Sequence, residues 1–174
     1  MIFEPTPLAG LLVLRATPSG DARGDFARLW CGAEFAAAGL PLEPLPLRVT
    51  RNPARHTLRG MHWQAPPHGE TKLVRVQRGA VFDVAVDLRS DSATYRRWFG
   101  LRLDAAGLAA LLVPPGFAHG FLTLSEDAEV LYLIDTPYLP EAARGCRHDD
   151  PAIGIAWPAT PAVIGARDLQ WPAL

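Results

Sequence analysis

Short apolar stretches separated by turn residues recur along most of the chain. Residues 81–88 alternate most clearly, because the even-numbered positions are apolar and share one side of an extended chain, whereas Asp83 and Asp87 fall on the other. Similar patterns predict further strands over residues 11–14, 25–30, 45–50, 73–77, 98–103, 110–113, 118–124 and 129–135.

One helix is indicated, over residues 31–38, which contain alanine and glutamate, end before Gly39 and are followed by Pro41. Prolines are scattered through the rest of the chain, as expected for many short elements joined by turns. Many short strands of this kind favour an antiparallel sandwich or a closed barrel. We therefore predict an all-β fold, a cupin-type jelly-roll β-barrel with few short helices and a pocket at its mouth.

The length of 174 residues fits a single domain over residues 1–174, with an N-terminal strand and a C-terminal tail. The formal net charge is −1 and basic residues form no run, so we expect no nucleic-acid partner. Apolar runs are too short for a membrane span, and the N-terminus lacks the pattern of a signal peptide. Cys31 and Cys146 are far apart, which is typical of free thiols in a reducing cytoplasm.

The richest stretch for chemistry is residues 57–72, which contains Arg59, His62 and Lys72. Lys72 is the only lysine in the chain, so generic surface charge explains it poorly. Arg59, by contrast, could simply form a surface ion pair. The stretch becomes more informative when it is combined with polar residues elsewhere in the sequence.

His119 and Tyr132 each lie among apolar residues of predicted strands. His119 has a phenylalanine two positions away on either side, so the three side chains share one face of an extended chain. Alone, such a histidine is more often structural, and such a tyrosine is usually a core residue with a satisfied hydroxyl. Asp168, near the C-terminus, could likewise cap a turn. Two histidines, one lysine and one tyrosine on barrel strands nevertheless favour a functional site.

A metal site is one alternative, because such barrels often bind metal through a His-x-His pair, a downstream glutamate and a distant histidine. Gln64 stands where the second histidine of the pair would be. His68 and Glu70 lie in a segment flanked by proline and glycine, and His119 could be the distant ligand. This spacing does not suit a rigid set of ligands on strands. We favour a site without metal and keep a metal-dependent dioxygenase as the weaker alternative.

Longer motifs occur in a fixed order: TLRGMHWQ at 57–64, KLVR at 72–75, GAVFDVAVDLR at 79–89, PPGFAHGF at 114–121, DDPAIGI at 149–155 and WP at 157–158. They closely resemble the dTDP-4-dehydrorhamnose 3,5-epimerases, and the resemblance runs from about Gly24 to Pro172. It implies a homodimer that exchanges strands, and an enzyme that needs no metal or organic cofactor.

The resemblance also implies a role for individual residues. The catalytic set is a base, its orienting carboxylate, an acid and a lysine near the sugar, which match His62, Asp168, Tyr132 and Lys72. The substrate-binding set comprises residues near the nucleotide, the phosphate or the sugar, and matches Arg23, Phe26, Arg59, His119 and Tyr138.

The implied substrate is a nucleoside-diphosphate-linked 4-keto-6-deoxy sugar, whose ketone acidifies the hydrogens at C3 and C5. Inverting a carbon requires a base on one ring face and an acid on the other, so His62 and Tyr132 are the minimum pair. A histidine suits the base because its pKa lies near neutrality, and a carboxylate such as Asp168 fixes its tautomer. Lys72 could stabilise the enolate oxygen. Planar arginines such as Arg59 suit the diphosphate.

Other functions stay open at this stage. A mono-epimerase of C3 or C5, or a keto-isomerase, would use the same base and enolate, and a catalytically inactive sugar-nucleotide binder would keep the pocket. The chain departs from the family pattern at four positions, Leu47, Val49, His56 and His148. These departures affect the pocket wall, so they bear on the substrate more than on the reaction.

Overall fold

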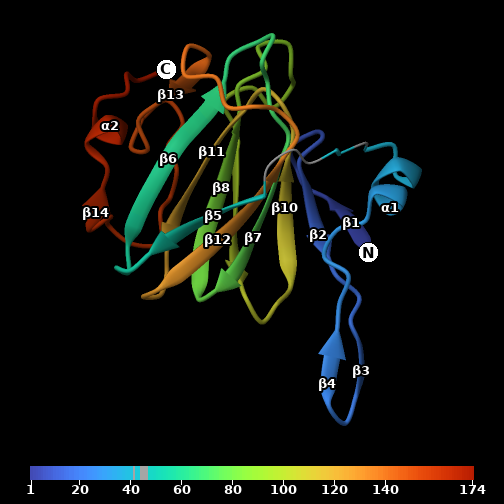
Figure 1. Ribbon diagram of the computed structural model, residues 1–174. Coiled ribbons are helices and arrows are strands. Elements are labelled where there is room, and N and C mark those ends of the chain that lie inside the picture. Colours follow the sequence, from blue (N-terminus) through green and yellow to red (C-terminus); the bar gives the residue numbers. More distant parts are fainter. Residues whose placement is uncertain (41, 44–46) are drawn as a thin grey trace.

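Two sheets built almost entirely from antiparallel strands face each other and form a barrel (Figure 1). The computed structural model describes residues 1–40, 42–43 and 47–174. The first sheet has the order β1-β2-β10-β7-β12-β5, with the bounds Ile2–Pro5, Leu12–Arg15, Ala109–Val113, Lys72–Arg78, Ala128–Ile134 and Leu47–Asn52. The second has the order β13-β6-β11-β8-β9, with the bounds Ala143–Gly145, Thr57–Gln64, Phe117–Thr123, Ala80–Asp87 and Trp98–Asp104.

The remaining elements lie outside the strand orders of the two main sheets. β3 (Ser19–Asp21) and β4 (Gly24–Phe26) form a hairpin that extends away from the barrel (Figure 1). α1 (Gly32–Ala37) follows the hairpin, and its Phe35 is fully buried in a cluster with Leu14 and Leu112 of the first sheet. In the C-terminal segment, β14 (Val163–Ile164) pairs in parallel with β6, and α2 (Ala166–Leu169) lies beside it. Neither helix is long and apolar enough to cross a membrane.

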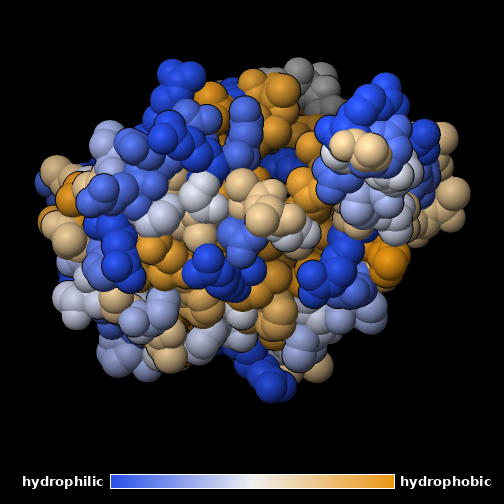
Figure 2. Space-filling view, turned by 90° about the horizontal axis from the view of Figure 1, so that it is seen from below, coloured by the Kyte–Doolittle hydropathy of each residue, from blue (hydrophilic) through white to orange (hydrophobic). Residues whose placement is uncertain are grey.

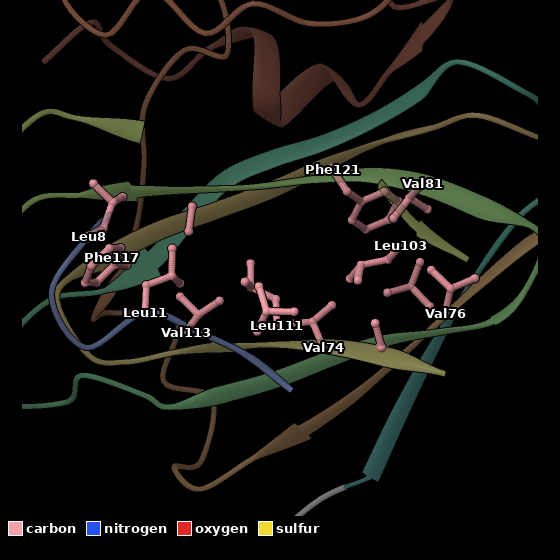
Figure 3. Packing of buried hydrophobic residues seen from close by; sticks show 14 of the residues in the cluster. Leu8, Leu11, Val74, Val76, Val81, Leu103, Leu111, Val113, Phe117 and Phe121 are labelled. Atoms are coloured by element: carbon pink, nitrogen blue, oxygen red, sulfur yellow. The ribbon is translucent and has the colours of Figure 1, made fainter. Parts of the chain in front are cut away.

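The main core fills space between the two sheets (Figure 3). Val74 and Leu111 from the first sheet pack with Val81, Leu103 and Phe121 from the second. Each such side chain contributes about 1.5–3 kcal/mol when it is fully removed from water. The apolar core therefore holds the two sheets together.

β8 is buried along almost its whole length, on both faces of the second sheet. Val84 and Val86 lie in a cluster with Cys146 and Ile153 of the C-terminal segment, on the outer face of the sheet. Val81 and Ala85 belong to the core between the sheets. The odd-numbered side therefore faces inward and carries the buried carboxylate of Asp83 into the barrel.

The prediction of an all-β fold is confirmed, and most predicted strands lie within two residues of the observed bounds. The predicted helix over residues 31–38 corresponds to α1. The predicted strand over residues 25–30 is wrong beyond Phe26, because only the short hairpin supplies a partner for it in the described structure. The first two positions of the strand predicted over residues 45–50 lie outside the described residues, and the rest belongs to β5.

Candidate active site

A cavity of about 430 Å³ opens between the two sheets, beyond the apolar core. The first sheet contributes polar and aromatic side chains from β5, β7 and β12, namely Arg48, Thr50, Lys72 and Tyr132. The second sheet contributes Arg59, His62, His119 and Phe121 from β6 and β11. The C-terminal segment closes one side with Gly165, Arg167, Asp168 and Trp171. Residues far apart in the sequence are thus brought to one cavity.

The two histidines lie side by side because β6 and β11 pair directly. His62 and His119 are cross-strand partners, so their side chains leave the sheet on the same face. The adjoining glycines let the two backbones come close: a Cβ on Gly60 would lie 2.6 Å from the Cα atom of Gly120. Gly60 also has a φ of +130°, a conformation that L side chains rarely adopt.

Asp168 holds His62 through a short hydrogen bond. The distance from His62 Nε2 to Asp168 Oδ1 is 2.6 Å, and the other carboxylate oxygen accepts the Gly60 N–H at 3.1 Å. Burial raises the pKa of the Asp168 carboxyl, but the hydrogen bonds from His62 and Gly60 outweigh it and lower the pKa below its usual value. The His62 side chain is 43 % exposed, so a ligand in the cavity can reach it.

Asp83 forms a second histidine–carboxylate pair with His119. The distance from His119 Nε2 to Asp83 Oδ1 is 2.9 Å, and both side chains are buried. The His119 ring meets the Tyr132 ring edge to face, with 6.1 Å between centroids. Burial and the charge of Asp83 raise the pKa of the Tyr132 hydroxyl far above its ordinary value, whereas Arg59 opposes the shift. The Tyr132 hydroxyl is therefore protonated at physiological pH.

Lys72 also lines the cavity and is almost completely buried. Its Nζ is 2.9 Å from Glu70 Oε1 and donates a hydrogen bond to the carbonyl oxygen of His62 at 3.2 Å. Both Lys72 and Glu70 line the cavity. The lysine is thus tied to the backbone of the residue that Asp168 orients.

Cationic and aromatic side chains surround the mouth of the cavity. Arg59 donates from Nε to Asn52 Oδ1 at 2.7 Å. Arg167 lies over the Trp171 ring, 5.0 Å from its centroid, and donates to the Tyr138 hydroxyl at 3.3 Å. This combination suits an anionic ligand that carries a planar group.

Arg23 and Phe26 lie elsewhere in a single chain, on the β3–β4 hairpin that points away from the barrel (Figure 1). The Arg23 side chain is 89 % exposed and paired with Asp21, and Phe26 is 78 % exposed. One chain therefore brings together seven of the nine residues singled out from the sequence, and leaves these two apart from the cavity.

In and around the cavity lie further residues that the sequence did not single out for the site. Asp83 was seen only as part of an alternating pattern, and Glu70 only as a possible metal ligand. Arg48, Arg144, Arg167 and Trp171 also line the cavity. No three of the histidine, cysteine, aspartate and glutamate side chains in the described structure are grouped as metal ligands would be.

Comparison with known proteins first defines the class. A crystal structure of dTDP-4-dehydrorhamnose 3,5-epimerase from Bacillus anthracis, with TDP and PPi bound, superposes with a TM-score of 0.96 at 34% identity, covering 99% of both chains. With a cupin-like jelly-roll fold and a polar cavity between its sheets, the chain is an isomerase-class enzyme of this kind.

The family follows from sequence comparison. Residues 5–174 match the family model described as dTDP-4-dehydrorhamnose 3,5-epimerase. The enzyme of that name from Sinorhizobium fredii is 40% identical over 179 residues, covering 100% of this chain and 90% of the relative. A dTDP-4-dehydrorhamnose 3-epimerase from Streptomyces niveus is 35% identical and covers 97% of this chain and 81% of the relative. The chain belongs to the dTDP-4-dehydrorhamnose 3,5-epimerase family.

Proposed function

We propose that this enzyme inverts C3, C5 or both in a dTDP-linked 4-keto-6-deoxy sugar, through an enolate. Membership of the family supports the substrate class, and the similar Bacillus anthracis enzyme was crystallised with TDP. The observation that carries the proposal is that His62 and Tyr132 project from different sheets. They line one cavity from opposite sheets, so a sugar ring between them would have a base on one face and an acid on the other.

His62 is the proposed base. Asp168 engages Nε2, so Nδ1 is the nitrogen left to accept a proton from the sugar. The carboxylate fixes this tautomer and stabilises the imidazolium that forms. The lowered pKa of Asp168 keeps its charge available for this purpose at neutral pH.

Tyr132 is the proposed acid. Its hydroxyl is protonated at neutral pH, so it has a proton to deliver to the ring face opposite His62. Removal of a C3 or C5 proton sends its electron pair toward the ketone, which becomes an enolate with negative charge at O4. Return of a proton from the tyrosine face restores the ketone with the carbon inverted.

Lys72 is the proposed partner of the enolate oxygen, because a buried ammonium stabilises developing negative charge strongly. His119 is proposed to contact the sugar, held by Asp83 as His62 is held by Asp168. Arg59 and Tyr138 are proposed to bind the diphosphate and the nucleotide near the cavity mouth.

We propose a homodimer that exchanges strands, in which the hairpin of one chain completes the cavity of its partner. Phe26 and Arg23 are too exposed to have a role in a single chain, yet an aromatic ring and a cation suit a nucleoside diphosphate. β5 lies at the edge of the first sheet and exposes Leu47 and Val49. The space-filling view also shows apolar residues between polar ones at one end of the molecule (Figure 2). A second copy would cover such surfaces.

We further propose that residues 1–174 act as one epimerase domain in the cytoplasm, without a metal or organic cofactor. The lysine and the two histidine–carboxylate pairs can move protons and stabilise the enolate unaided. Cys31 and Cys146 form no disulfide, as expected for a reducing compartment.

Mono-epimerisation is the second candidate, because the Streptomyces niveus relative named as a 3-epimerase is also similar over nearly the whole chain. A keto-isomerase or an inactive binder would keep the same cavity. Incubating the purified enzyme with dTDP-4-keto-6-deoxyglucose and following the C3 and C5 protons by NMR separates these functions. We expect inverted product at one or both carbons. A sugar that is bound but keeps both protons and its configuration would contradict the proposal.

A further inference from the structure

Glu70 is a carboxylate in the cavity that the proton-transfer scheme does not use. Its side chain is only 11 % exposed and lies 2.9 Å from the ammonium of Lys72, whose side chain is 9 % exposed. An ammonium buried without a partner would cost several kcal/mol, so this contact is needed to keep the charge in place. Among the described residues, Glu70 is the carboxylate that pairs with Lys72.

Two oxygens hold the Lys72 ammonium in place. A lysine ammonium has three N–H donors and no acceptor. Glu70 Oε1 forms an ion pair with it at 2.9 Å, and the carbonyl oxygen of His62 accepts one of its N–H groups at 3.2 Å. Lys72 lines the cavity, so an N–H that is not bound by His62 is available to a ligand there. Because one acceptor belongs to His62 itself, the ammonium is held at a fixed place relative to that imidazole.

The segment that carries Glu70 is itself firmly held. Gln64 donates to the carbonyl oxygens of His68 and Pro137 at 3.2 and 3.1 Å. Thr71 N–H donates to Asp135 Oδ1 at 2.8 Å. These hydrogen bonds connect both ends of the segment to the chain that follows β12, so Glu70 is presented by a braced segment.

We propose that Glu70 is a positioning residue for the epimerisation: it holds the ammonium of Lys72 so that its free N–H meets the enolate oxygen. The inference rests on the proposed function. A carboxylate beside the ammonium also reduces the field at the sugar, which opposes catalysis. Fixed placement outweighs this loss, because a misplacement of about 1 Å can cost about 10²-fold in rate.

The kinetic test compares Glu70→Gln with Glu126→Gln, a change of the same kind at an exposed turn residue that does not line the cavity. The glutamine keeps the size of the side chain and removes its charge. We expect Glu70→Gln to lower kcat at least about tenfold with KM changed less than about threefold, because the interaction acts mainly on the enolate. Glu126→Gln should match the wild type. A Glu70→Gln enzyme with wild-type kcat would overturn the inference.

A second measurement needs no substrate. Lys72 is the only lysine, so protein labelled with ¹⁵N-lysine gives one ammonium signal. Its protons should exchange with water several-fold faster in Glu70→Gln than in the wild type and in Glu126→Gln. Unchanged exchange would overturn the pairing, whatever the reaction proves to be. If wild-type protein fails to turn over the sugar while the exchange difference is present, the proposed function fails and the pairing stands.

A shorter carboxylate guards against a folding artefact. Glu70→Asp keeps the charge, but its shorter side chain places the carboxylate farther from the Lys72 ammonium. Its kcat and its rate of ammonium proton exchange should therefore lie between those of the wild type and Glu70→Gln. If Glu70→Gln does not fold, Glu70→Asp carries the test alone, with slower turnover and faster exchange than wild type expected. Wild-type values for both in a folded Glu70→Asp would then overturn the inference.

Discussion

At the scale of single residues, the carboxylate of Asp168 holds the His62 ring through the 2.6 Å hydrogen bond to Nε2. Asp168→Asn tests whether the carboxylate of Asp168 supports His62 as the base. We expect proton exchange and inversion to slow by about 10²-fold with the same product, because the amide no longer fixes the tautomer or stabilises the imidazolium. Turnover followed by NMR checks this. A variant as active as the wild type would contradict the role of Asp168.

The same substitution predicts a pH dependence of stability. The folded-state pKa of Asp168 is lowered, so its ionised form stabilises the fold above the unfolded value of about 3.9, and this contribution is lost as pH falls through the folded pKa. Asp168→Asn should therefore be less stable than wild type near neutral pH, and the difference should shrink below about pH 4. Urea unfolding at several pH values measures it. A difference that is constant with pH would show that the charge is not involved.

Gly60→Ala tests the close approach of the two histidine strands. The new methyl group would meet the backbone of Gly120 at 2.6 Å, and the positive φ adds strain of about 1–3 kcal/mol. We expect a loss of at least about 2 kcal/mol in the free energy of unfolding, measured with urea. Gly165→Ala is the matched control, because nothing lies within 4 Å of a Cβ there. Equal effects in the two variants would contradict this explanation.

The sequence predicted some contacts of the cavity and not others. Residue spacing placed His119 and Tyr132 on strand faces, but only the resemblance to a family connected Asp168 with His62, 106 positions away. Asp83 was missed because a carboxylate in an alternating strand is usually on the solvent side. Here the C-terminal segment covers the apolar side of β8, so the carboxylate faces inward.

At the scale of elements, strands with an apolar pattern were predictable. β7, β8, β9, β11 and β12 have seven or eight residues, long enough for an alternating or continuous apolar pattern to emerge. β6 has eight residues but was not predicted as a strand, because Arg59, Gly60 and His62 interrupt its apolar positions. β13, β14 and α2 have two to four residues, and they form because the C-terminal segment packs beside β6. The β3–β4 hairpin has no apolar side for a pattern to report, since its residues are exposed.

The hairpin makes a prediction about shared sites. If it completes the partner's cavity, Arg23→Ala and His62→Asn should each reduce activity, yet a dimer with one chain of each kind should contain one intact site. Co-expression with two purification tags isolates that dimer. We expect activity near half that of the wild type. Activity no higher than that of the two parent variants would show that the hairpin does not act in the partner's site.

At the scale of the whole molecule, the fold was predictable because many short strands joined by turns have few stable arrangements. The cavity was less so, since it depends on which faces of two sheets meet and on how the C-terminal segment closes one side. At this scale, the proposed mechanism requires the two sheets to present a base and an acid to opposite faces of one sugar ring.

Tyr132→Phe in heavy water tests that claim most directly. His62 would still remove a proton and return a deuteron to the same face, whereas the opposite face would lack its donor. The account predicts that deuterium enters the substrate at C3, C5 or both, with little inverted product, and that His62→Asn abolishes both exchange and inversion. A Tyr132→Phe enzyme that inverts the sugar at near the wild-type rate would contradict the account.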